Sequence, residues 1–222
     1  MREIVFDTET TGLDPKTGDR LVEIGCVEMV NRVQTGVTFH QYFNPQRDMP
    51  AEAERVHGLS EAFLADKPLF KDEAQAFLDF IGDSPMVAHN ASFDFGFINN
   101  ELTMVGLPIV ELDRMVDTVR IARSRHPGAK NSLDALCTRY GIDRSHRTKH
   151  GALLDAELLG GRQIGLELAA EQGLVESTVV ETTVITRERV QRPARPHHAS
   201  EAELAAHAKF LESIKTPLWL SD

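Results

Sequence analysis

The stretch Ile4-Val5-Phe6-Asp7-Thr8-Glu9-Thr10-Thr11-Gly12 decides both the fold class and the kind of site. Its first three residues are apolar and rich in β-forming side chains, which predicts a buried strand. Because residues i and i+2 of a strand point to the same face, Asp7 and Glu9 converge. Two like charges at this spacing repel each other. A strand end that holds them either leaves both in water or uses them to bind hard cations, which prefer oxygen ligands.

Outward from this strand, the hydrophobic pattern predicts consecutive strands followed by alternating strands and helices. Further strands are expected at 21–29, 33–43 and 85–89. Helices are expected at 51–57, 60–65, 72–81, 91–105, 118–125, 132–140 and 151–171. This change of pattern indicates an α/β fold with a mixed sheet.

The length and composition describe a globular protein with one full domain and a tail. The chain has 222 residues, 41% of them hydrophobic, and a formal charge of −10. No apolar run approaches the roughly 18–20 residues needed to span a bilayer, and no cleavable signal is evident, so we expect a cytoplasmic protein without a membrane partner. The two cysteines, Cys26 and Cys137, cannot build a disulfide framework or a four-cysteine zinc site, and we expect both to be core thiols.

The net acidity argues against a protein that grips nucleic acid alone, because such proteins are usually basic. The charge is uneven, however. Residues 114–150 contain nine Lys or Arg residues and three Asp residues, a net charge of +6, and the rest of the chain carries −16. This basic stretch is either a solvated helical face or a path for a phosphate backbone.

The composition changes after Glu176. A Val/Thr-rich stretch and a Pro/Arg/His-rich stretch fill 176–199, which we interpret as a linker or an extended docking segment. Residues 200–203 form a capping-box pattern, and an apolar helical stripe follows until Pro217. This helix either folds back on its own domain or binds a partner, for which the single tryptophan, Trp219, would serve as an anchor. The predicted parts are therefore a domain at 1–175, a linker at 176–199 and a helical tail at 200–222.

Two more segments carry residues suited to chemistry. Asp94 follows a short buried strand and begins a helix, at the end of the sheet where α/β proteins keep their sites, although it could merely favour the helix dipole. His150 and Asp155 are five residues apart, which on one continuous helix would leave their side chains roughly 140° apart. They can share a site only if His150 lies in the loop before the helix. Asp155 lies among apolar residues, where a charge is costly unless paired or bound to a metal.

Four carboxylates and one histidine from three remote segments match the needs of two-metal phosphodiester hydrolysis. The carboxylates would hold two divalent ions, and a histidine, which titrates near neutrality, could take the proton of the attacking water.

These segments resemble the three exonuclease motifs of the histidine-bearing subgroup of the DEDD superfamily. Asp7 and Glu9 match the first motif, Asp94 the second, and His150 and Asp155 the third. The chain more closely resembles the epsilon proofreading subunits of bacterial DNA polymerase III. That resemblance covers about 1–172 strongly, and its most specific segments are residues 7–13, 56–58, 89–91, 131–137 and 150–156.

The resemblance implies a ribonuclease-H-like fold, with a mixed five-stranded sheet flanked by helices and a C-terminal helical tail. It also implies a 3′→5′ exodeoxyribonuclease that proofreads DNA synthesis and releases deoxynucleoside 5′-monophosphates. Asp7, Glu9 and Asp155 would hold one divalent ion, Mg²⁺ or Mn²⁺. Asp7 would bridge to a second ion, which Asp94 would hold directly or through water, and His150 would be the general base.

The resemblance further implies contacts to the 3′-terminal nucleotide. Besides Asp7, Glu9 and Asp155, the implied contacts are Thr10, Thr11, Gly12, Leu13, Glu52, His57 and Phe93. His57 could instead serve only as a helix end beside Gly58. Phe93 could stack on a base or belong to the core, since Phe97 follows at helical spacing.

The implied partners are the 3′ end of single-stranded or mismatched DNA and the polymerase alpha subunit, through residues 200–222. Direct contact with a sliding clamp is doubtful, because residues 172–177 lack the aromatic side chain of the usual clamp-binding peptide. Apart from the resemblance, we offer the hypothesis that the basic stretch from Arg114 to Lys149 guides the strand backbone, which neutralising Arg123, Arg125 and Arg147 together would test.

Two rival functions remain. One is an RNA-trimming exonuclease of the same superfamily, because metals and carboxylates act on the phosphate that both nucleic acids share. The other is a non-catalytic adaptor that only docks on the polymerase.

Overall fold

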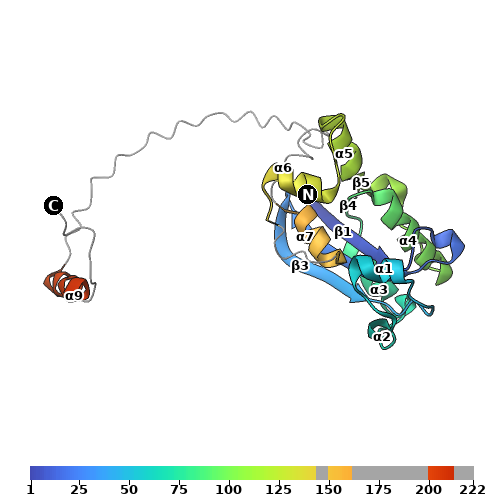
Figure 1. The fold of residues 1–222 in the computed structure, drawn as a ribbon, viewed down its shortest axis with the longest axis horizontal. Helices are drawn as coiled ribbons and strands as arrows, with labels where there is room; N and C mark the ends of the chain where they lie inside the picture. The colour runs from blue at the N-terminus through green and yellow to red at the C-terminus, as the bar shows by residue number, and fades with distance from the viewer. Residues whose placement is uncertain (144–149, 162–199, 213–222) are drawn as a thin grey trace. The chain divides into compact units, whose positions relative to one another are not determined.

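The computed structural model describes residues 1–143, 150–161 and 200–212 (Figure 1). Contacts divide the chain into a unit at 1–178 and a unit at 179–222. The first unit contains β1 (Arg2–Thr10), η1 (Pro15–Thr17), β2 (Leu21–Val30), β3 (Val33–Tyr42), α1 (Ala51–His57), α2 (Glu61–Leu64), α3 (Phe70–Ile81), β4 (Met86–Ala88), α4 (Ala91–Met104), η2 (Leu112–Arg114), β5 (Met115–Asp117), α5 (Thr118–Arg125), α6 (Leu133–Tyr140) and α7 (Ala152–Leu159).

The five strands form one mixed sheet in the order β3-β2-β1-β4-β5. The first three strands pair antiparallel, and β4 and β5 extend the sheet in parallel beside β1. The predicted α/β class and mixed five-stranded sheet are confirmed. The hydrophobic pattern did not locate β5, because a three-residue strand is too short to show a period.

Helices cover both faces of this sheet. On one face, α3 and α4 pack against alternate β1 residues, including Ile4 and Phe6, in a core that also contains Met86. On the other face, α5, α6 and α7 pack with Val5 and Met29. Figure 1 shows β1 in dark blue through the middle of the domain, with α7 in orange beside it. Asp7 and Glu9 therefore belong to the face of β1 that α7 covers.

The structure corrects one predicted helix. A continuous helix was expected over 151–171, but α7 ends at Leu159, and neither Gly160 nor Gly161 continues it. Two consecutive glycines disfavour a helix because their backbones lose the most conformational freedom on folding. Residues 162–171 lie outside the described part of the chain. Cys26 and Cys137 are buried thiols, as predicted.

The second unit is described through α9 (Glu201–Glu212). The expected capping box is present: the Ser200 hydroxyl accepts from the backbone N–H of Glu203, and the Glu203 carboxylate accepts from the backbone N–H of Ser200. The predicted linker at 176–199, the clamp-peptide segment at 172–177 and residues 213–222, including Trp219, lie outside the described residues. None of the described helices is long and apolar enough to cross a membrane.

Candidate active site

The carboxylates of β1 lie where the start of α7 packs closely against the sheet. Asp7 pairs across the ladder with Gly25 of β2. A Cβ on Gly25 would lie 2.2 Å from the backbone nitrogen of Leu153, a distance that no real side chain tolerates. The missing side chain therefore lets α7 approach the sheet directly above the ladder position of Asp7.

The two residues of the third motif adopt the arrangement that sequence spacing required. His150 precedes the helix, Gly151 is its N-cap, and Asp155 lies in its first turn. The Nδ1 atom of His150 lies 3.3 Å from Oδ2 of Asp155. The histidine side chain is 50% exposed and that of Asp155 only 4%. The pair therefore presents an accessible imidazole at the edge of a buried carboxylate.

Asp94 reaches the site from the opposite face of the sheet. It lies in the first turn of α4 and is 2% exposed. The hydroxyl of Thr8 donates to Oδ1 of Asp94 at 2.6 Å, which ties α4 to β1 between the two acidic residues of that strand. Burial raises the pKa of Asp94 to about 7, and the hydrogen bond from Thr8 opposes that rise.

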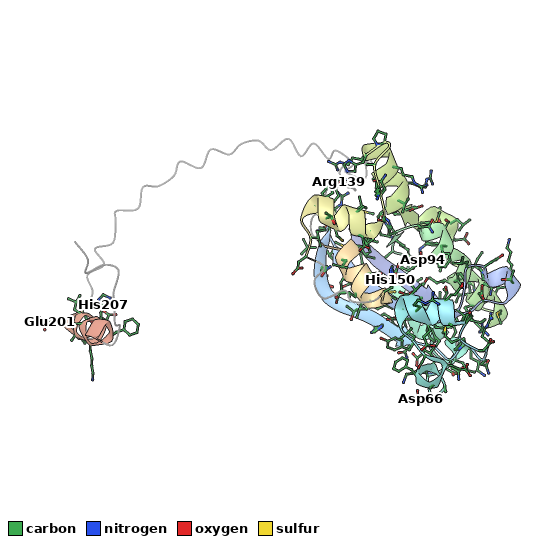
Figure 2. All side chains as sticks on the ribbon, viewed as in Figure 1. Asp66, Asp94, Arg139, His150, Glu201 and His207 are labelled. Carbon is green, nitrogen blue, oxygen red and sulfur yellow. The ribbon has the colours of Figure 1, made fainter. Side chains whose placement is uncertain are left out.

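One cleft of about 440 Å³ brings all five predicted catalytic residues together. Figure 2 labels Asp94 and His150 in the same region of the domain. The lining residues come from β1 and the loop after it, the β4–α4 junction, the start of α6, and α7: Asp7, Thr8, Glu9, Leu13, His89, Asn90, Phe93, Asp94, Ser132, Leu133, His150 and Asp155.

The donor atoms of this cleft suit a divalent cation. Glu9, His150 and Asp155 each place one potential ligand atom within 4.8 Å of the others, and Asp7 and Asp94 line the same cleft. Carboxylate oxygens are the ligands that Mg²⁺ and Mn²⁺ prefer. Burying Glu9, Asp94 and Asp155 side by side is costly unless cations offset their charge. The residues present therefore fit the expected metals.

A second cavity, of about 550 Å³, contains the residues expected to contact the terminal nucleotide. It is lined by Thr8, Glu9, Thr10, Thr11, Gly12, Leu13, Asp19, Pro50, Glu52, Ala53, Val56, His57 and Phe93. We call it the terminal pocket. It shares Thr8, Glu9, Leu13 and Phe93 with the catalytic cleft, so the two cavities adjoin. Leu13 is 85% exposed, an unusual position for a large apolar side chain and one suited to contact a base.

The loop that forms one wall of the terminal pocket is held by Asp19. Its Oδ1 accepts from Nη1 of Arg47 at 2.9 Å, and its Oδ2 accepts from the backbone N–H of Asp14 at 3.2 Å. A Cβ on Gly12 would lie 2.2 Å from Oδ2 of Asp19, so glycine lets the loop lie against this carboxylate.

His57 lies both at the end of α1 and in the wall of the terminal pocket. It ends α1, and its Nδ1 accepts from the backbone N–H of Leu59 at 3.0 Å, which places the proton of a neutral ring on Nε2. The buried ring also lines the terminal pocket. The preceding carbonyl, of Val56, accepts from the backbone N–H of His150 at 3.3 Å, so α1 is joined to the loop that carries His150.

Sequence reasoning missed several residues that build this site. Thr8 received no role because strand alternation assigns it to the other face of β1, and only the structure shows that Asp94 arrives on that face. Asp19 carried no motif signal. Gly25 had a usable signal, because glycine within a strand often marks a close approach of backbone.

Comparison with known proteins agrees with this geometry. The RNase_T exonuclease family matches residues 4–160. The chain is 45% identical over 225 residues to the DNA polymerase III subunit epsilon of Rickettsia conorii, with 96% of each chain covered.

The chain belongs to the DNA polymerase III epsilon subunit family. The resemblance to epsilon subunits that the sequence indicated is therefore confirmed, and so is the predicted activity as a 3′→5′ exonuclease.

Solved structures extend the comparison of the epsilon family fold. Exonuclease X, solved in complex with 5′ overhanging duplex DNA, is 28% identical, with a TM-score of 0.57 over 78% of this chain and 92% of that one. The nuclease domain of 3′hExo, a DEDDh family member bound to rAMP, superposes with a TM-score of 0.64 over 76% of this chain and 92% of that one. At 14% identity, this second likeness shows the fold alone, which is the predicted ribonuclease-H-like one. Exonucleases of this type depend on divalent metal ions.

Proposed function

We propose that the chain is the epsilon subunit of a bacterial DNA polymerase III. There it would remove mispaired nucleotides from the 3′ end of a growing DNA strand as deoxynucleoside 5′-monophosphates, in the cytoplasm. The observation that carries this proposal is the single cleft in which Asp7, Glu9, Asp94, His150 and Asp155 meet. The curated relatives named as this subunit support the polymerase context.

The carboxylates of the cleft would hold two divalent ions, Mg²⁺ or Mn²⁺. Asp7, Glu9 and Asp155 would bind the first, Asp7 would also reach the second, and Asp94 would hold the second directly or through water. Bound there, the ions would stabilise the attacking and leaving oxygens of phosphodiester hydrolysis. A non-catalytic adaptor has no use for these converging buried acids, which cost stability when no cation is bound.

His150 would act as the general base. Its half-exposed ring can reach a water that enters the cleft, and its contact with Asp155 holds the ring in place. The water would lose its proton to His150 as its oxygen bonds to phosphorus. The bond from phosphorus to the 3′-oxygen of the penultimate nucleotide would break, and that oxygen would take a proton from solvent water to become the new 3′-hydroxyl.

The terminal pocket would hold the 3′-terminal nucleotide. The loop at Thr10, Thr11 and Gly12, together with Glu52 and His57, would contact its sugar and phosphate. Leu13 and Phe93, which line both cavities, would contact the bases next to the scissile phosphate. Selectivity for mismatches would come from the cost of unpairing the end, a few kcal/mol for a matched pair and less for a mismatch.

The decisive test is cleavage of a 3′-mismatched DNA primer and of a matched RNA oligomer, each with Mg²⁺ or with EDTA. We expect metal-dependent release of deoxynucleoside monophosphates by the wild type and loss of that release in His150→Ala. The matched control is His207→Ala, which removes an exposed histidine of α9. Faster loss of RNA than of DNA would replace the proposal with the RNA-trimming reading. No cleavage of either, together with a thermal stability gain in Asp7→Ala/Glu9→Ala, would favour the adaptor.

The domain limits at 1–175, 176–199 and 200–222 belong to the same proposal. The tail at 200–222 would bind the alpha subunit, supported by α9, whose Leu204 is 57% exposed. Copurification with alpha should be lost when 200–222 are removed, while hydrolysis of a short single strand by the isolated chain stays unchanged. Retention of alpha by the shortened chain would contradict this assignment.

A further inference from the structure

A third cavity, of about 560 Å³, adjoins the catalytic cleft on the side away from the terminal pocket. It is lined by His89, Asn90, Val119, Arg123, Gly128, Ala129, Asn131 and Ser132. It shares His89, Asn90 and Ser132 with the cleft and no lining residue with the terminal pocket. The three cavities therefore follow one another, with the carboxylates in the middle.

Arg123 gives this cavity its charge. Among the described residues that line the cavity, no other carries a permanent charge. Arg123 lies close enough to His89 for its charge to act on that imidazole: burial lowers the pKa of His89, and the charge of Arg123 also lowers it. The salt bridges found in the described part of the chain use other cations, so Arg123 is not neutralised by any of them.

The helix that carries Arg123 is fixed to the strand that leads into the catalytic cleft. Oδ1 of Asp117 accepts from the backbone N–H groups of Asn90 at 3.1 Å and of Val119 at 2.9 Å. The hydroxyl of Thr118 donates to the carbonyl of Ala88 at 3.1 Å and contacts Nδ1 of His89 at 3.0 Å. The start of α5 is thus tied to the end of β4, and Arg123 has a defined position relative to the cleft.

The opposite wall of the cavity is a braced loop. Nδ2 of Asn131 donates to the carbonyl of Ala129 at 3.0 Å, and Nη2 of Arg139 donates to the carbonyl of Lys130 at 3.0 Å. The backbone N–H of Ala129 donates to the carbonyl of His126 at 3.2 Å, which closes a turn. Both walls are therefore preformed, as expected of a binding site rather than of a gap between mobile side chains.

We propose that Arg123 and this cavity bind the first internucleotide phosphate upstream of the scissile one, on a single nucleic-acid strand. The inference rests on the proposed function. A strand with its 3′ nucleotide in the terminal pocket and its scissile phosphate at the carboxylates continues into the adjoining third cavity. An arginine guanidinium matches phosphate oxygens in charge and geometry, and it ignores base identity, as a sequence-independent exonuclease requires.

This phosphate site also accounts for an acidic protein acting on an anionic substrate. The carboxylates of the cleft repel a strand wherever cations do not mask them, whereas Arg123 attracts the strand one nucleotide away. Loss of Arg123 should therefore raise KM more than it lowers kcat, and only for substrates long enough to have an upstream phosphate.

The test compares Arg123→Gln in the full chain on two substrates. The p-nitrophenyl ester of thymidine 5′-monophosphate fills the terminal pocket and the cleft but has no upstream phosphate. We expect its kcat/KM to be unchanged and that of an oligothymidylate to fall about tenfold, mainly through KM. The slope of log(1/KM) against log[salt] should shrink by about 0.7, the amount expected for one phosphate contact on a single strand. The matched control is Arg120→Gln, on an exposed residue of α5 outside the cavity.

A neutral methylphosphonate linkage then locates the contact. Placed at the first upstream linkage, it should weaken the wild type about tenfold and leave Arg123→Gln almost unaffected. Placed at the second or third linkage, it should affect both proteins alike. Equal losses for Arg123→Gln on the ester and the oligomer, or for Arg123→Gln and Arg120→Gln, would overturn the inference, as would unchanged sensitivity of Arg123→Gln at the first linkage. A wild type that hydrolyses neither substrate with Mg²⁺ would instead refute the proposed function.

Discussion

Two short helices with similar Ala-, Leu- and Glu-containing sequences, α7 and α9, are stabilised in opposite ways. Helix α7 begins at Gly151 with no side-chain cap, yet it buries most of its length against β1 and β2. Helix α9 begins with a complete capping box at Ser200 and Glu203, yet Leu204 and Phe210 are 57% and 60% exposed. Tertiary packing thus holds the first helix, and local hydrogen bonds cap the start of the second.

The way in which each helix is stabilised agrees with its proposed role. Isolated helices of about 12–15 residues are marginal in water, and a helix such as α9 with exposed apolar side chains agrees with the proposed docking on the polymerase. Helix α7 needs no partner because the sheet specifies its position. That position is also what brings Asp155 to the carboxylates of β1.

The largest expected effect comes from removing the buried charge of α7. Asp155→Asn should lower exonuclease activity roughly 10³-fold, because the cleft loses a metal ligand. The same change should raise the melting temperature of the metal-free protein, because a buried charge disappears. Steady-state kinetics would measure the change in activity, and calorimetry in EDTA would measure the change in melting temperature. Glu157→Gln, an exposed change on the same helix, should do neither. A stability loss in Asp155→Asn would contradict the view that the buried charge of Asp155 destabilises the metal-free fold.

The packing of α7 can be broken from the sheet. Gly25→Ala places a methyl group against the backbone of Ala152 and Leu153, so the helix must shift. We expect the free energy of unfolding to fall by about 3 kcal/mol, together with a loss of activity. Urea unfolding would measure the first quantity. Gly96→Ala is the control, since a Cβ there meets nothing within 4 Å. Equal stability of the two variants would show that α7 does not depend on this contact.

The pH dependence of stability in the metal-free protein tests the cost of a buried carboxylate at Asp94. Its pKa is raised to about 7, so the folded state holds this proton more tightly than the unfolded state does. Stability from this group is therefore complete below the unfolded value near pH 4 and is lost as the pH rises through about 7. We expect a loss of roughly 2–3 kcal/mol, softened by water entering the cleft. Unfolding measured in EDTA should show a weaker pH dependence in Asp94→Asn, and an unchanged slope would contradict the assignment.

The smallest effect tests α9. Ser200→Ala removes the cap and should destabilise this helix by about 1 kcal/mol, whereas Ser200→Asp should preserve it. Carbon chemical shifts of residues 201–206 would report the helix content. Exonuclease activity on a short strand should not change in either variant. Full helix content in Ser200→Ala would show that something other than local bonds supports α9.

Much of the fold could be predicted because its signals are local. Alternation along β1, capping at Asp117, and the apolar stripe of α3 each follow from neighbouring residues. The cap of α6 was placed at Asn131, one residue too early, because Ser132 is the residue whose side chain accepts from the backbone of Ala135. The end of α7 at Leu159 was missed, because its apolar periodicity was weighed above the two glycines. The strand β5 was missed because its three residues gain their strand character from pairing with β4.

The convergence of Asp7, Glu9, Asp94, His150 and Asp155 in one cleft could be predicted because chemistry restricts which side chains come together at a strand end. Their supports could not. The bond from Thr8 to Asp94 joins residues 86 positions apart, and the close approach at Gly25 depends on where a helix from the far end of the domain packs. Such contacts are properties of the assembled sheet, and no window of sequence contains both partners.

The hydrogen bond between His150 and Val56 links the terminal pocket to the catalytic cleft. Helix α1 supplies Glu52 and His57 to one cavity, and through the Val56 carbonyl it also supports the backbone of the histidine in the next. A nucleotide that displaces α1 would therefore also displace His150, the proposed general base. Under the proposed function, the same turn of α1 would set both the fit of the nucleotide in the terminal pocket and the position of His150, so a badly seated 3′ end would also be cut slowly.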